Sequence, residues 1–83
     1  MALCVVEYHH EPPLSDDAFD EASRNLKPCI EQRNLTWRAT YLSKDRRNQF
    51  CVFETPDAET LRDAFRTAGV AFERIWPADS WIA

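Results

Sequence analysis

Residues 48–69, NQFCVFETPDAETLRDAFRTAG, constrain the fold of this chain more than any other segment. The apolar run at 50–53 is short and rich in aromatic residues, which is typical of a β-strand. Thr55 follows as a candidate helix cap, and Pro56 suits the first helical position, where its missing N–H removes no hydrogen bond. Apolar residues then recur at helical spacing as far as Gly69, the expected C-terminal stop. The segment therefore predicts a strand that leads directly into an amphipathic helix.

Three other segments have the composition and length of strands. Residues 2–9 are apolar on both faces, so a strand there is expected to be covered on both sides. Residues 35–43 alternate in polarity, and the polar turn at 44–47 would join them to the next strand as a hairpin. Residues 70–76 predict a last strand that ends at Pro77, because proline cannot donate to a sheet ladder.

A second helix is predicted between the first two of these strands. Ser15 is its expected N-cap, and its apolar stripe continues to about Glu31. Pro28 lies within the stripe, where it has no N–H to donate and its ring crowds the preceding turn. We therefore expect a kink in the helix or a break near Lys27.

The resulting order of strand, helix, strand, strand, helix, strand is that of the ferredoxin-like βαββαβ fold. This is an α+β fold in which two helices cover one face of a four-stranded antiparallel sheet. The length of 83 residues predicts one such domain, residues 1–83. Two helices cover only one face, yet the first and third strands are apolar on both. We therefore expect the open sheet face to pair with a second copy, as in dimeric α+β barrels, or to meet a small ligand.

Composition narrows the partners and the compartment. The net charge of −4 disfavours binding along a phosphate backbone, and the third-strand motif of RNA-recognition domains is matched only at Arg46, Phe50 and Phe53. Three cysteines without CxxC spacing argue against a disulfide framework or a zinc ribbon and favour a reducing compartment. The first residues resemble neither a signal peptide nor a membrane span. We expect a cytoplasmic protein that binds neither nucleic acid nor membrane.

Four side chains are the main candidates for a functional site. In the ferredoxin-like order the end of the first strand lies beside the start of the third, which can bring Glu7, His9 and Cys51 to one edge of the sheet. Tyr41 would lie nearby as a possible pocket residue. Carboxylate, imidazole and thiolate are ligands that nickel and zinc accept. Structural roles stay open, since Cys51 in an apolar strand is also typical of a small buried residue and His9 of a surface residue.

The stretch 41–57, YLSKDRRNQFCVFETPD, together with the helix that follows it, resembles a family of small bacterial proteins of unknown function that includes nickel-binding-protein-like members. The resemblance extends from the first strand to Trp76. It implies a ferredoxin-like fold and a dimer. It also implies a metal site, because Glu7-Tyr8-His9 matches the family's acidic-x-His triplet and Phe50-Cys51 matches its Phe-Cys pair. The histidines that the family carries in its two helices are absent here.

Three functions follow from these observations. The first is a small dimeric binding protein that holds nickel or another divalent transition metal through Glu7, His9 and Cys51. The second is a small enzyme whose pocket lies between the open sheet face and the dimer partner, with Tyr41, His9 and Glu7 as acid or base groups. The third is a purely structural interaction module. We expect a binding protein in preference to an enzyme.

Overall fold

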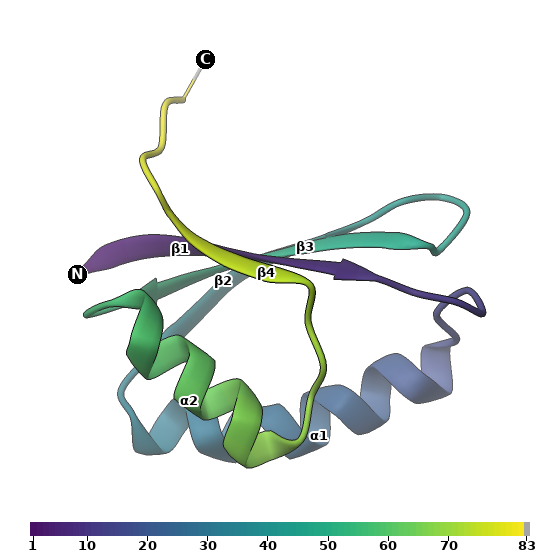
Figure 1. Ribbon diagram of the computed structural model, residues 1–83, viewed down its shortest axis with the longest axis horizontal. Helices are drawn as coiled ribbons and strands as arrows, with labels where there is room; N and C mark the ends of the chain where they lie inside the picture. The colour runs from purple at the N-terminus through teal and green to yellow at the C-terminus, as the bar shows by residue number, and fades with distance from the viewer. Residues whose placement is uncertain (83) are drawn as a thin grey trace.

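A four-stranded antiparallel sheet with two helices on one face makes up the protein (Figure 1), which is described for residues 1–82 in a computed structural model. The elements are β1 (Ala2–His9), α1 (Asp16–Gln32), β2 (Thr36–Leu42), β3 (Asn48–Thr55), α2 (Ala58–Ala68) and β4 (Arg74–Ala78). The strand order is β2-β3-β1-β4, and every neighbouring pair is antiparallel. This arrangement confirms the predicted ferredoxin-like α+β fold.

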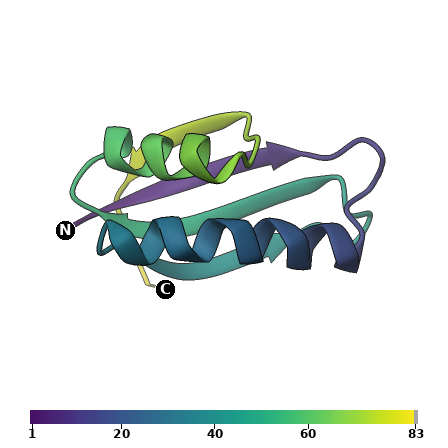
Figure 2. The same cartoon turned by 90° about the horizontal axis from the view of Figure 1, so that it is seen from below.

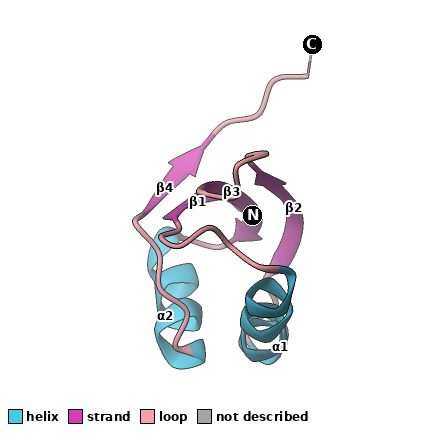
Figure 3. Ribbon diagram, turned by 90° about the vertical axis from the view of Figure 1, so that its right-hand side faces the viewer, coloured by secondary structure: helices cyan, strands magenta, loops and turns pink. Residues whose placement is uncertain are grey.

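The two helices lie side by side beneath the sheet, and none of residues 1–82 forms a helix on its other face (Figures 2 and 3). The chain after β4 rises from the sheet on this uncovered side, away from both helices (Figures 1 and 3). Among residues 1–82, no helix has the length and apolar content needed to cross a membrane.

The core lies between the helices and the sheet, where every second residue of the central strands β1 and β3 points. Its buried apolar members are Cys4, Val6, Tyr8, Leu26, Cys29, Ile30, Leu35, Cys51, Phe53, Leu61, Ala64, Phe65 and Ile75. The residues between them along β1 and β3 face the uncovered side. Strand alternation therefore decides which side chains belong to the core and which remain available for function.

Helix α1 begins as predicted but does not break. The Ser15 side chain accepts a hydrogen bond from the backbone N–H of Ala18 at 3.1 Å, so Ser15 is the N-cap. The helix then continues through Pro28 to Gln32, and the predicted break near Lys27 is wrong. Pro28 and Arg24 are both exposed, so water can bond to the Arg24 carbonyl that the proline leaves without its helical partner.

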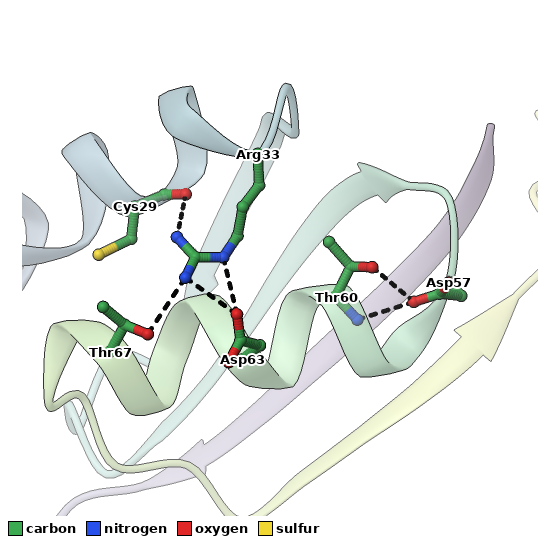
Figure 4. A network of polar contacts seen from close by, with 6 residues as sticks. All are labelled: Cys29, Arg33, Asp57, Thr60, Asp63 and Thr67. Carbon is green, nitrogen blue, oxygen red and sulfur yellow. Dashed lines mark hydrogen bonds and ion pairs between the residues drawn. The ribbon is translucent and has the colours of Figure 1, made fainter.

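Helix α2 begins later than predicted. Its N-cap is Asp57, whose carboxylate accepts from the backbone N–H of Thr60 at 2.7 Å (Figure 4). Thr55 is instead the last residue of β3, and its hydroxyl donates to the Asp57 carbonyl at 2.8 Å. The predicted stop at Gly69 is confirmed, with φ of 71°, a left-handed conformation that glycine adopts at low cost.

The last strand is also shifted, from the predicted residues 70–76 to Arg74–Ala78. Val70 and Phe72 pack against the core from the connection that precedes β4, which explains why their apolar character suggested a strand. Pro77 lies within β4 because this strand is at an edge of the sheet, where proline is tolerated.

One arginine connects the two helices. Arg33, which follows α1, donates to the Cys29 carbonyl at 3.1 Å and to the Thr67 hydroxyl at 3.1 Å (Figure 4). Its Nε and Nη2 atoms donate to Asp63 Oδ2 at 3.1 and 2.9 Å. A single guanidinium thus bonds to the C-terminal turn of α1 and to two side chains of α2.

Replacing Arg33 with alanine should lower the free energy of unfolding by about 1–2 kcal/mol. Charged hydrogen bonds contribute more than this when buried, but Asp63 is 58% exposed, so solvent screening reduces the loss. Urea unfolding followed by circular dichroism measures the effect. Arg24→Ala is the matched control, since Arg24 is exposed on α1 and makes no ion pair or hydrogen bond through its side chain to any described residue. Equal losses of unfolding free energy in both variants would show that the contacts between Arg33 and α2 do not stabilise the fold.

Candidate functional site

The uncovered face of the sheet, here named the open face, presents large apolar side chains to solvent. It consists of Leu3, Val5, Glu7 and His9 from β1, Arg38, Ala39 and Tyr41 from β2, Asn48, Phe50, Val52 and Glu54 from β3, and Arg74, Trp76 and Ala78 from β4. Val52 lies at the centre, directly opposite Val5 on one side and Ala39 on the other. Tyr41, Phe50 and Trp76 are 65%, 46% and 39% exposed. Solvent-exposed aromatic side chains of this size mark an interaction surface when they gather on one face.

The charged residues of the open face form two ion pairs. Arg38 lies 3.2 Å from Glu54, and Arg74 lies 3.0 Å from Glu7. Glu7 uses both of its carboxylate oxygens, because the second accepts a hydrogen bond from Trp76 Nε1. The bond from Trp76, and then that from Arg74, hold the pKa of the Glu7 carboxyl below its ordinary value. Glu7 is therefore a charged carboxylate whose two oxygens each accept one hydrogen bond.

His9 lies at the end of β1, on the same face as Glu7, and is exposed. Its Nδ1 atom is 3.3 Å from Asn48 Oδ1 and its Nε2 atom is 3.5 Å from the carboxylate of Glu11. These contacts orient the imidazole toward the loop that follows β1. They do not bring it to Cys51.

Cys51 lies on the opposite face of the sheet from Glu7 and His9. The register of β1 and β3 pairs it with Val6, so both side chains point toward the helices, and Cys51 has no exposed surface. Its sulfur lies 3.2 Å from the Thr40 hydroxyl and accepts from Gln49 Nε2 at 3.3 Å. Burial raises the pKa of the thiol, which keeps it protonated at neutral pH and makes it a poor metal ligand.

The predicted convergence of Glu7, His9 and Cys51 is therefore not found. Across residues 1–82, no three His, Cys, Asp or Glu side chains are grouped so that they could hold a metal ion. The donor set does not fit a divalent transition metal, because the buried, protonated thiol of Cys51 lies on the face of the sheet opposite to Glu7 and His9, and one carboxylate and one imidazole are too few ligands.

Tyr41, the predicted pocket residue, lines a shallow groove of about 420 Å³ on the open face. Leu3, Val5 and Val52 form its floor, and Trp81 from the C-terminal segment borders it. Tyr41 stands directly opposite Phe50 in the hairpin, and no hydrogen bond among the described residues joins it to His9 or Glu7. Arg38, Asp79 and Ser80 also line the groove, so it offers both apolar and polar contacts.

Known proteins resemble this chain in sequence pattern and in fold. A family model described as "Nickel responsive protein SCO4226-like" matches residues 5–77. The chain belongs to the SCO4226-like family. The crystal structure of SCO4226 from Streptomyces coelicolor A3(2) has the same fold, with a TM-score of 0.84 at 15% sequence identity, covering 98% of this chain and 100% of that chain. No curated protein matches the sequence.

For this SCO4226-like chain, we expect any effect of nickel on stability to be independent of Glu7, His9 and Cys51. Binding to the native state raises stability by about 2.7 kcal/mol at a hundredfold excess of ligand over Kd, so Tm with and without nickel chloride reports a site directly. The change in Tm caused by nickel should be the same for wild type, His9→Ala and Cys51→Ala, although Cys51→Ala lowers Tm under both conditions. If nickel raises the Tm of the wild type and either variant abolishes this increase, the hypothesis of a metal site made by Glu7, His9 and Cys51 would be supported again.

Proposed function

We propose that this protein is a small homodimeric binding module whose two copies pair through their open faces. The observation that supports this most directly is the exposure of Tyr41, Phe50 and Trp76 on a sheet face that no helix covers. Removing apolar surface from water is favourable by roughly 25 cal/mol per Å², so a second sheet placed on this face gains much of what a helical layer would have supplied. Small chains in particular gain stability by association.

The charges of the open face suit a second copy. Within each copy, the charges of each ion pair cancel. The pair Arg38–Glu54 lies at one end of the apolar centre around Val52, and the pair Arg74–Glu7 lies at the other end. Two such faces can approach without bringing unpaired charge of one sign together, even though the chain as a whole carries a net charge of −4. A symmetric dimer needs a self-complementary surface of this kind.

The C-terminal segment supports the same arrangement. Trp81 and Ile82 are 85% and 96% exposed, and the segment that carries them rises on the side of the open face (Figure 3). An exposed Trp-Ile pair beside this groove is stabilised if a second copy covers it. We infer that this segment forms part of the dimer interface and borders the groove lined by Tyr41.

The dimer also bears on the nickel-related description of the family. One copy offers no cluster of three metal-ligating side chains within residues 1–82, so a divalent transition metal in this protein would need donors from more than one copy. Cys4, Cys29 and Cys51 are all free and buried, which supports our proposal of a reducing, cytoplasmic compartment.

Isotope-filtered NMR tests the proposed interface. A one-to-one mixture of ¹³C-labelled and unlabelled protein should show intermolecular NOEs from the rings of Trp76 and Trp81 to the methyl groups of Leu3, Val5 and Val52. These contacts are expected because the aromatic side chains and the aliphatic centre belong to the same face. Intermolecular NOEs confined to the helix side, or none at millimolar concentration, would contradict the proposal.

A further inference from the structure

A second hollow lies on the helix side of the sheet, away from the proposed dimer interface. It has a volume of about 340 Å³, is partly open to solvent, and is bordered by α1, by the core face of the sheet and by the connection that follows α2. Phe19, Leu26, Trp37 and Val70 give it apolar walls. Sites for small organic ligands have volumes of about 300–1,000 Å³ and combine apolar walls with a few placed polar groups. This cavity is at the lower end of that range.

Polar side chains also line the cavity: Glu21, Ser23 and Asn25 on α1, and His10 and Gln49 at the sheet. His10 and Gln49 belong to a chain of hydrogen bonds that continues behind the cavity wall to Cys51 and Thr40. His10 Nε2 lies 2.7 Å from Gln49 Oε1, and Gln49 Nε2 donates to Cys51 Sγ at 3.3 Å. On the other side of the sulfur, the Thr40 hydroxyl lies at 3.2 Å and itself accepts from Trp37 Nε1 at 3.0 Å. Gln49 is only 4% exposed and points toward a core built mainly from apolar residues, with Thr55 as the other buried polar residue described.

Gln49 is unexpected at this position from stability alone. A buried amide must find hydrogen-bond partners to offset its desolvation, whereas an apolar side chain at the same core position of β3 would need none. Gln49 bonds to Cys51 and to His10, and the bond to His10 holds the imidazole in place. Tyr8 adds to this, since its ring is stacked on the imidazole with a centroid distance of 5.8 Å and an interplanar angle of 18°.

This arrangement determines which hydrogen bond His10 can offer a ligand. A carbonyl oxygen such as Gln49 Oε1 only accepts, so His10 Nε2 carries the proton of the bond between them. In the neutral imidazole the remaining nitrogen, Nδ1, is then an acceptor. No described residue donates to His10 Nδ1, and His10 lines the cavity.

We propose that this cavity binds a small, flat, mostly apolar molecule with one N–H or O–H group, which the His10 imidazole accepts. Aromatic walls from Phe19 and Trp37 suit a planar ring system. The cavity lies on the face of the sheet opposite to the open face, so the proposal does not depend on the homodimer.

Indole and 1-methylindole are the probes that test this site, because they differ by one N–H donor. In ¹H–¹⁵N correlation spectra of the whole chain, indole should shift the signals of the Trp37 side chain, the Gln49 side-chain amide and Val70, with a Kd of about 1 mM or tighter. 1-Methylindole should bind at the same place about five- to tenfold more weakly, since it cannot donate to His10.

Two substitutions separate the contributions of shape and of hydrogen bonding. His10→Phe keeps a ring but removes the acceptor, so indole and 1-methylindole should then bind with equal affinity. His9→Phe is the matched control on the open face and should leave the preference for indole unchanged. Ala22→Phe places a ring in the cavity from α1 and should weaken both probes at least tenfold, which tests the site even if His10→Phe fails to fold.

Shifts that gather on the open face, equal binding of the two probes to wild type, or no localised shift up to the solubility limit of indole would each overturn the proposal. The mass of the protein in solution tests the proposed homodimer independently of these binding experiments. Failure of the cavity site and failure of the dimer are therefore distinguishable.

Discussion

Replacing Phe65 with alanine is expected to lower the free energy of unfolding by about 3–5 kcal/mol, the typical cost of removing a buried ring from a core. Phe65 has no exposed surface, and its ring centroid lies 5.7 Å from those of Phe53 and Phe72 and 6.0 Å from that of Tyr8. The ring thus joins α2 to β1, β3 and the connection before β4. Thermal and urea unfolding followed by circular dichroism measure the loss.

Phe65→Leu provides the control for this prediction. Leucine keeps an apolar side chain in the same space and should cost less than about half as much as alanine. It also keeps the test informative if Phe65→Ala is too unstable to purify, since small domains are stable by only about 5–15 kcal/mol. An alanine variant that loses less than about 1 kcal/mol would contradict the central position assigned to Phe65.

Replacing Val52 with arginine is expected to raise the dissociation constant of the proposed homodimer at least about a hundredfold. Val52 lies at the centre of the open face, paired with Val5 and Ala39, so in the dimer its substituent would be buried. A buried charge without a partner costs several kcal/mol, and about 2.7 kcal/mol corresponds to a factor of a hundred. Sedimentation velocity over a range of concentrations measures the change.

Gln32→Arg is the matched control, because it changes the net charge by the same amount on the exposed surface of α1. This variant should dimerise like wild type. Circular dichroism should show that Val52→Arg keeps its secondary structure, since Val52 points away from the core. Unchanged association of Val52→Arg would place the interface elsewhere.

The helices and strands of the fold could be predicted from local sequence patterns. The predicted boundaries were wrong where contacts with residues distant in the sequence determine them. The strand at residues 2–9 and the cap at Ser15 depend on local pattern and side-chain hydrogen bonding, and both are confirmed. Thr55 and Asp57 are both residue types that cap helices, with aspartate the more favourable of the two. The structure selects Asp57 because Thr55 is buried as the last residue of β3.

The candidate site could be predicted only in part, because the sequence of one strand does not determine which residue of the neighbouring strand lies opposite each of its own. Glu7 and His9 are two residues apart and share a face in any strand. Whether Cys51 joins them depends on its cross-strand partner, which is Val6 on the core side. Gln49 could have been predicted as a candidate site residue from the sequence. It occupies a core-facing position of β3, where a buried amide requires hydrogen-bond partners.

The mass of the protein in solution tests the open-face pairing most directly. Sedimentation equilibrium or light scattering at micromolar concentration should give twice the chain mass of 9.7 kDa for wild type, and the mass of one chain for Val52→Arg under the same conditions. A wild-type protein that remains folded at 9.7 kDa up to millimolar concentration would show that water, and not a second copy, covers the open face.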